Sequence, residues 1–545
     1  MNFDQILSLV GGFGKYQKVL YLWVSFPQLI LAWHMMVTVF TGAQPPHHCP
    51  QHGNSLLDTA SVASASFVFH QNLSTSVPAD GPGPNHSSCY SVIIRDNRSV
   101  RVQSCEQGWV YSNETFLSTV VTEWDLVCDR GWLNSLASAI YMFGLLVGSV
   151  VFGFMADRYG RRFVLLLALA LQTVFGSLAA FAPNFPIYVC LRFVVGSTIS
   201  GVIINAFVIG TEWTCTERRV LAPIATDFAF SFGVMSLAGL AYLMRDWRHL
   251  QLAISVPGFL LIWYIWVIPE SARWLLTKGR TDDAMVLLRK AALTNGRQLP
   301  PSIQFDKALT GGKKQTYTPL DLMRTHQLRK MVIILFYLWF VNVLVYYGLA
   351  LGVSRLGSNI YMTQFAFGLI EIPARGLVLL VLPWSRRLAQ GGFLAFGGAA
   401  CLLMLAVPAD HPNIITGLAL AGKFGITASF CVIYIYTAEL FPTVLRQTGI
   451  GMCGVFARIG GVLAPLINLL HSHSPVTPLL IFGTMPLLGA ALCVALPETA
   501  GRPLPDTVED AENCDTSTYT APFSSGLCED TSKSIPSKEE QECCI

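Results

Sequence analysis

Apolar runs long enough to cross a membrane recur along the whole 545-residue chain. A helix rises about 1.5 Å per residue, so roughly 20 apolar residues span the hydrocarbon core of a bilayer. Apolar residues make up 52% of the chain and charged residues only 13%, against about 25% charged in soluble proteins. Twelve such runs lie at 19–41, 133–156, 163–183, 187–209, 221–243, 250–268, 331–352, 360–382, 392–408, 414–436, 447–470 and 477–496. The sequence therefore predicts an all-α membrane protein with twelve transmembrane helices.

A basic segment at 269–330 divides the runs into two sets of six. It holds twelve Lys and Arg against five Asp and Glu, which predicts a cytoplasmic loop. Both termini are then expected in the cytoplasm, with a short segment at 1–18 and a polar, disordered tail at 497–545. The first run is too long for a signal peptide and no cleavage site follows it. The predicted domains are an N-terminal six-helix bundle at 19–268 and a C-terminal one at 331–496.

A long polar loop at 42–132 separates the first two predicted helices. Its four N-x-[ST] sequons predict glycosylation and an extracellular position at the plasma membrane. The same loop contains four cysteines, an even number that predicts two disulfides with three possible pairings. The sequons begin at Asn72, Asn85, Asn97 and Asn113, and the cysteines are Cys49, Cys89, Cys105 and Cys128.

Charged residues gather at the predicted cytoplasmic helix ends in both halves. In the first half they are Asp157, Arg158, Arg161, Arg162, Glu212, Arg218, Glu270 and Arg273; in the second they are Glu439, Arg446 and Glu498. After the eighth run, only Ser385-Arg386-Arg387 matches the longer motif of the first half. Such opposite charges are suited to a gate that ties helices together in one state of the cavity. Ordinary topology anchoring by basic residues is the alternative.

Arg458 lies halfway along the run at 447–470, roughly 16 Å deep by helix rise. A charge at that depth is costly and normally faces a water-filled cavity or a partner. The residue is therefore predicted to belong to an anion-binding site, with a structural ion pair as the alternative.

Several motifs resemble the major facilitator superfamily, and more closely the organic anion and cation transporter family. They are 153–162, Glu123-Trp124-Asp125-Leu126-Val127-Cys128, Pro269-Glu270-Ser271-Ala272-Arg273-Trp274-Leu275 and 439–449, together with 10–17 at the start. In that family an Asp in span eleven is typical of cation carriers and an Arg of anion carriers. Arg458 places the sequence with the anion carriers, as does Arg375 in Glu371-Ile372-Pro373-Ala374-Arg375.

The resemblance implies two six-helix bundles around a central cavity. Arg458 and Arg375 are expected to hold a carboxylate, although Arg375 also lies one helical turn from Glu371 and is suited to pair with it. The aromatic residues expected to line the cavity are Trp339, Tyr346, Tyr347, Phe430, Tyr434, Phe230 and Phe207. Packing or lipid contact is the alternative for each. His34 and Met35 are weaker candidates, and His34 is equally suited to be a core histidine.

No Walker A, H-E-x-x-H or G-x-S-x-G motif is present, so neither enzymatic activity nor a cofactor or metal is predicted. A net charge of +3 does not favour nucleic-acid binding. The expected function is secondary active exchange of organic anions, such as aromatic carboxylates, urate or nicotinate, against an intracellular dicarboxylate or monocarboxylate. A cation or carnitine-like zwitterion carrier and a non-transporting receptor are the alternatives.

Overall fold

The computed structural model describes residues 3–50, 89–95, 99–105, 108–215, 221–300, 322–355, 359–408, 410–442, 445–501 and 505. Within these residues twelve helical segments are long and apolar enough to cross a membrane, which confirms the predicted number. They are Lys15–Thr41, Cys128–Tyr159, Arg161–Ala179, Phe185–Glu212, Thr226–Leu243, Trp247–Val267, His326–Leu351, Ile360–Val381, Arg386–Ala406, Pro412–Leu440, Thr448–Ser472 and Val476–Cys493.

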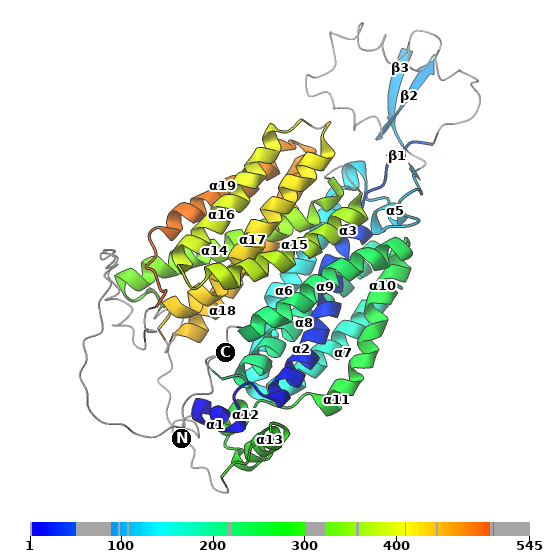
Figure 1. Ribbon diagram of the computed structural model, residues 1–545. Coiled ribbons are helices and arrows are strands. Elements are labelled where there is room, and N and C mark those ends of the chain that lie inside the picture. Colours follow the sequence, from blue (N-terminus) through cyan, green and yellow to red (C-terminus); the bar gives the residue numbers. More distant parts are fainter. Residues whose placement is uncertain are drawn as a thin grey trace.

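The helices form two bundles of six that lie side by side, as predicted (Figure 1). The first contains α2 (Lys15–Met36), α6 (Trp132–Tyr159), α7 (Arg161–Ala179), α8 (Phe185–Glu212), α9 (Leu221–Leu243) and α10 (Trp247–Ser255). The second contains α14 (His326–Leu351), α15 (Ile360–Val381), α16 (Arg386–Leu403), α17 (Pro412–Leu440), α18 (Arg446–Leu469) and α19 (Val476–Cys493). The sixth span continues as the 3₁₀ segment η4 (Val256–Trp263) and α11 (Tyr264–Val267). Pro257, which lacks an N–H group, lies where the α-helix ends.

Small residues bring the helices of each bundle close together. A Cβ atom on Gly148 of α6 would lie 2.0 Å from the Ser197 carbonyl oxygen of α8, and one on Gly196 would lie 2.3 Å from the Tyr141 carbonyl oxygen. The two backbones therefore touch directly, which is how helices pack without a hydrophobic driving force in lipid.

Shorter helices lie outside the spans. They are α1 (Phe3–Val10), α12 (Ala272–Thr277) and α13 (Thr281–Thr294). Asn295, just after α13, donates from Nδ2 to the Val10 carbonyl oxygen at 2.8 Å and accepts from the Tyr16 N–H at 2.8 Å. This side chain fastens the N-terminal segment to the beginning of the central loop.

The polar loop between α3 (Thr38–Thr41) and α6 contains short strands, which were not predicted. Strand β1 (His47–His48) pairs with β4 (Val110–Tyr111), and β2 (Tyr90–Arg95) pairs with β3 (Ser99–Ser104), both antiparallel. The short helices α5 (Val120–Glu123) and η2 (Cys128–Arg130) follow. We call the end of the bundle that carries this loop the loop end.

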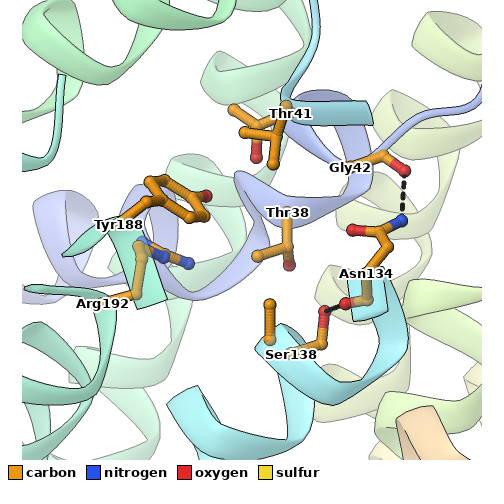
Figure 2. Close-up of a pocket in the computed structure, with 9 residues that line it drawn as sticks. Thr38, Thr41, Gly42, Asn134, Ser138, Tyr188 and Arg192 are labelled. Carbon is orange, nitrogen blue, oxygen red and sulfur yellow. Dashed lines mark hydrogen bonds between the residues drawn. The ribbon is translucent and has the colours of Figure 1, made fainter. Parts of the chain in front are cut away.

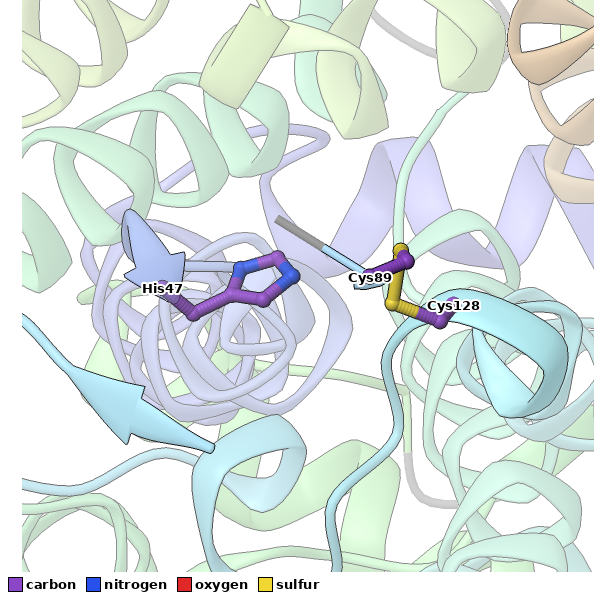
Figure 3. A group of neighbouring side chains, drawn as sticks. All are labelled: His47, Cys89 and Cys128. Carbon is purple, nitrogen blue, oxygen red and sulfur yellow. A yellow bond between two sulfur atoms is a disulfide. The ribbon is translucent and has the colours of Figure 1, made fainter. Parts of the chain in front are cut away.

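Two disulfides connect the loop, as predicted, and the structure selects one of the three pairings. They join Cys49 to Cys105 and Cys89 to Cys128. His47 lies beside the second disulfide (Figure 3), but both sulfurs are already bonded to each other and offer no thiolate to a metal. Of the sequon asparagines, Asn113 is exposed. Asn72, Asn85 and Asn97 lie outside the described residues.

Helices α9 and α15 form one of the seams that join the halves. At the loop end Tyr361 of α15 stacks on Phe40 of α3, with ring centroids 5.6 Å apart, and meets Tyr242 of α9 edge-on at 5.5 Å. Its hydroxyl donates to the Thr115 carbonyl oxygen at 2.9 Å. A Cβ atom on Gly368, further along α15, would lie 2.7 Å from Met235 of α9. The loop ends of the two halves are therefore packed together.

Candidate anion-binding site

Arg458 lies midway along α18 and has no carboxylate within 4.0 Å among the described residues. Its Nη1 donates to the Gly454 carbonyl oxygen, one turn earlier in the same helix, at 2.9 Å. Its Nε is buried and has no hydrogen-bond partner, while the residue as a whole is half-buried. Tyr347 of α14 and Tyr434 of α17 are near enough to interact with it electrostatically. The ion pair considered for Arg458 is thus not present in the described residues.

Arg375 behaves differently, because it is buried in an ion pair. Its Nη1 lies 3.1 Å from Glu371, one turn away on α15, and its Nε lies 3.9 Å from Asp227 of α9. The same Nη1 donates to the Ser231 hydroxyl, which donates in turn to Glu371 at 2.9 Å. The alternative reading of Arg375, pairing with Glu371, is the arrangement that the structure contains.

Glu371 is the centre of a wider buried network. Lys423 of α17 lies 3.2 Å from its carboxylate, with the ammonium 3.0 Å from the centre of the Tyr346 ring. The Tyr346 hydroxyl donates to Glu371 at 2.6 Å. Two carboxylates, Asp227 and Glu371, thus balance two cations, Arg375 and Lys423. This balance leaves Arg458 as a partly buried charge that no carboxylate of the described residues neutralises.

Five of the predicted cavity residues form one continuous aromatic cluster. Trp339 meets Tyr434 edge-on at 4.4 Å and Phe430 at 6.0 Å, and Phe430 and Tyr434 lie 5.5 Å apart. Tyr346 continues the cluster to Phe430 at 6.1 Å and to Tyr347 at 5.3 Å. The Trp339 indole donates to the Thr437 hydroxyl at 2.9 Å, which fixes the ring. The cluster and Arg458 therefore lie on neighbouring helices of the second half.

Of the remaining predicted cavity residues, Met35 contacts this cluster. The Met35 sulfur accepts from the Tyr347 hydroxyl at 3.9 Å and so brings α2 to the site. Phe230 of α9 is partly buried against the main core, whereas Phe207 of α8 is exposed over 44% of its surface. His34 is fully buried, and a Cβ atom on Gly176 would lie 2.8 Å from both its ring and Ser255. This position matches the core-histidine alternative.

At the end opposite the loop, the charged residues of the first half form a network within that half. Arg161 lies 3.1 Å from Asp157 and 3.7 Å from Glu212. Glu270 accepts from the backbone N–H groups of Arg161 at 3.0 Å and Arg162 at 3.2 Å, at the N-terminus of α7. A carboxylate there is stabilised by the unpaired N–H groups and the helix dipole.

The second half repeats this arrangement. Arg386 pairs with Glu439 at 3.1 Å, and Glu498 accepts from the N–H groups of Arg386 at 2.9 Å and Arg387 at 3.2 Å. Ser385 also donates to Glu498. Burial alone raises the pKa of the Glu498 carboxyl, but the hydrogen bonds from Ser385 and the backbone outweigh it and lower the pKa. Arg161, Glu212 and Glu270 thus correspond to Arg386, Glu439 and Glu498.

The other predicted gating residues that the structure describes make further contacts at this end of the protein. Arg158 lies over the Tyr159 ring at 5.4 Å and Arg273 over the Phe3 ring at 6.0 Å. Arg446 donates to the Phe441 carbonyl oxygen at 3.3 Å. Arg218 lies outside the described residues. The ion pairs at this end of the protein, Arg161 with Asp157 and Glu212 and Arg386 with Glu439, connect residues of the same half, so their role in gating stays a prediction.

Sequence reasoning missed Ser231 and the aromatic contacts of Tyr361. A single Ser within the apolar run at 221–243 carries no periodic signal, and Tyr361 is one of many aromatic residues near a helix end. Lys423 lies within the apolar run at 414–436, and its partner on α15 was not predictable from spacing. Lys423 and Glu371 are far apart in the sequence and lie on different helices, so helical spacing cannot indicate their contact.

The protein has twelve spans in two bundles, a charged, aromatic centre and the same charged network at equivalent helix ends of both halves. These features define a multi-pass membrane transporter of the major facilitator fold. Known proteins agree with this class. The inward-open xylose transporter XylE from E. coli aligns with a TM-score of 0.60 and 16% identity, over 91% of this chain and 99% of that chain. At that identity the likeness shows the fold.

The family follows from sequence comparisons. The sugar (and other) transporter model matches residues 86–510. Human solute carrier family 22 member 13 is 38% identical, over 99% of this chain and 96% of that protein. Organic anion transporter 3 of Oryctolagus cuniculus is 37% identical over 94% of each, and the organic cation transporter protein of Drosophila melanogaster is 38% identical over 94% and 95%. The chain belongs to the sugar (and other) transporter family and, within it, to solute carrier family 22.

Proposed function

We propose that this transporter exchanges organic anions by alternating access, and that Arg458 holds the anionic group of the substrate. The observation that carries the proposal is the contrast between Arg458 and Arg375. Both are guanidinium groups deep in the second half, but Arg375 pairs with Glu371 at 3.1 Å and Arg458 pairs with no carboxylate among the described residues. An unneutralised guanidinium attracts carboxylates and disfavours organic cations.

The aromatic cluster supports a substrate with a flat organic body. Rings of Tyr347 and Tyr434 lie near the guanidinium, and Trp339 and Phe430 extend the apolar surface beyond them. Aromatic walls with one fixed charge fit aromatic carboxylates and urate- or nicotinate-like anions and tolerate variation in shape. Arg375 then contributes to the field of the site only through its paired charge, so Arg458 is the main anchor.

The direction of transport rests on the predicted topology. The disulfide-bonded loop is proposed to face the outside of the plasma membrane, with both termini in the cytoplasm. The packed loop end then corresponds to a transporter closed toward the outside, and the substrate exchanges against an intracellular dicarboxylate or monocarboxylate.

The test is uptake into cells that express the protein. Radiolabelled urate, nicotinate and p-aminohippurate are compared with the cation tetraethylammonium, with and without preloaded dicarboxylate or monocarboxylate. We expect saturable anion uptake that preloading increases and that Arg458→Asp abolishes with normal surface abundance. Uptake of tetraethylammonium alone would assign the chain to cation carriers, and no saturable uptake of any compound would favour a receptor.

A further inference from the structure

A polar pocket lies at the loop end of the first half (Figure 2). Its lining comes from α3, the beginning of α6, the loop and α8, and every lining residue belongs to the first half or the loop. The polar side chains among them are Thr38, Thr41, Asn134, Ser138, Tyr188 and Arg192. The aromatic cluster and Arg458, in contrast, belong to the second half. The pocket is therefore not part of the proposed substrate site.

Arg192 is the charge of this pocket, and it has no counter-charge. Its exposed fraction is 1%, and no carboxylate oxygen lies within 4.0 Å of it among the described residues. Nη2 donates to the His34 carbonyl oxygen at 3.2 Å, and the guanidinium lies 4.3 Å from the centre of the Tyr141 ring. Nη1 is buried without any hydrogen-bond partner. A buried cation that is not paired is among the most costly groups in a folded protein.

The other polar groups of the pocket supply donors rather than a negative charge. The Thr38 hydroxyl makes no hydrogen bond within the part of the chain that the structure describes. Asn134 donates to the Gly42 carbonyl oxygen at 2.8 Å, and the Ser138 hydroxyl to the Asn134 carbonyl oxygen at 3.3 Å. In Figure 2 the Arg192 guanidinium extends toward the part of the group in which Thr38 lies. Arg192, with its unpartnered Nη1, and Thr38 thus line one pocket that has no acidic side chain among its lining residues.

We propose that this pocket binds a small monovalent inorganic anion of the halide class, with chloride as the physiological form. A halide supplies the missing negative charge to Nη1 and accepts the hydrogen of the Thr38 hydroxyl. Water satisfies donors but leaves the charge unneutralised, and a metal cation is repelled by the guanidinium. An aromatic carboxylate lacks here the ring cluster that surrounds Arg458. The inference does not rest on the proposed function.

The position of the pocket connects anion binding to closure of the loop end. Helix α3 is a single turn, with Thr38 and Thr41 lining the pocket and Phe40 between them. Phe40 is the residue that stacks on Tyr361 of the second half. An anion that orders α3 therefore favours the packed arrangement of the two halves at this end.

The test is chloride binding to purified full-length protein in detergent, with gluconate replacing chloride at constant ionic strength. Radiolabelled chloride is measured by equilibrium dialysis in the Arg458→Gln variant, so that the unpaired guanidinium of α18 does not contribute. We expect saturable binding of one chloride per chain. Adding Arg192→Gln should weaken binding by at least about tenfold, the effect of a lost charge-assisted hydrogen bond. Adding Thr38→Val, which keeps the side-chain shape, should weaken it about fivefold.

Each outcome decides the proposal. Absence of saturable chloride binding in the Arg458→Gln variant overturns it, and so does an affinity that neither added substitution changes. If Arg192→Gln does not fold, Thr38→Val decides alone, because that variant keeps the guanidinium and its contacts with His34 and Tyr141. Organic-anion uptake is not part of this assay, so its result is separate from that of the proposed function.

Discussion

Replacing Arg458 with Gln should raise the KM for organic-anion uptake without reducing the amount of protein in the membrane. Among the described residues, the guanidinium makes one hydrogen bond, to the Gly454 carbonyl oxygen of its own helix. Removing the charge therefore leaves no carboxylate of the described residues unpaired, and it removes a partly buried charge that has no counter-charge among them. Folding should be unaffected or slightly favoured, while the anchor for the substrate carboxylate is lost.

The magnitude follows from the kind of contact that is removed. A hydrogen bond to a charged group contributes about 1.5–3 kcal/mol, and about 1.4 kcal/mol corresponds to a factor of ten in affinity. KM should thus rise by roughly 10- to 150-fold. Arg458→Lys keeps the charge but loses the planar fork, so its KM should lie between those of the wild type and Arg458→Gln.

Arg375→Gln is the matched control, because it removes the same group from a paired environment. The substitution leaves Lys423 as the one cationic partner of Glu371 among the described residues, and it removes the guanidinium that donates to the Ser231 hydroxyl. Breaking a buried pair costs about 3–5 kcal/mol, a large part of the roughly 5–15 kcal/mol that stabilises a folded protein. The expected result is a reduced amount of protein in the membrane. The double variant Asp227→Asn/Arg375→Gln should recover part of that amount, because the two charges that remain, Glu371 and Lys423, balance each other.

Surface biotinylation measures the amount of protein, and a concentration series of labelled substrate measures KM for each variant. The reasoning would be refuted by the opposite pattern. If Arg375→Gln raises KM at normal surface abundance and Arg458→Gln leaves KM unchanged, the substrate anchor is on α15 and the ion pair opens during binding.

Three further predictions concern the loop end, the loop and the opposite end. Tyr361→Ala removes the stacking on Phe40 and the hydrogen bond to the Thr115 carbonyl oxygen, so the loop end should open more often. Cysteines introduced along the seam should then react faster with a membrane-impermeant thiol reagent, with the exposed Cys190 as the reference. Unchanged reaction rates would contradict the closure. Replacing the four sequon asparagines, of which Asn113 is exposed, should lower the apparent mass in a gel, and an unchanged mass contradicts the topology. Glu498 has a lowered pKa. Its contribution to stability is therefore complete at pH values above the ordinary Glu pKa of about 4.3, and it is lost as the pH falls through the lowered pKa. Wild-type melting temperature should therefore fall more steeply than that of Glu498→Gln in acid, and parallel curves would contradict the assignment.

The sequence was sufficient for the number of spans and for the position of Arg458 midway along its helix, because both depend on local composition. It also contained both readings of Arg375, since a residue one turn from Glu371 can pair with it. Selecting between them required the third partner, Ser231, which approaches from a helix of the other half. The disulfide pairing was likewise open, because four cysteines in one loop are compatible with three connections.

The charged network at the end opposite the loop is repeated in the second half more fully in the structure than in the sequence motif. After α15 only Ser385-Arg386-Arg387 is similar to the longer motif after α6. Yet Glu498 accepts hydrogen bonds from the backbone N–H groups at the start of α16, as Glu270 does from those at the start of α7. The arrangement requires only a carboxylate at the N-terminus of a helix, so it can persist where most of the sequence motif is absent.

The seam between α9 and α15 has chemically different ends, and this difference bears on how the halves move. Near the loop the contacts of Tyr361 are aromatic, whereas deeper in the membrane Glu371 and Arg375 meet Ser231 and Asp227 through hydrogen bonds and charges. Separating aromatic rings at a surface exposes them to water at modest cost. Separating α9 from α15 deeper in the membrane takes Asp227 away from Arg375 and Ser231 away from Glu371 in a medium of low polarity, which costs more. The loop end is therefore the part of the seam expected to open first, with the polar contacts of Glu371 acting as the pivot. Alternating access then requires Tyr361 to leave Phe40 while Ser231 stays hydrogen-bonded to Glu371.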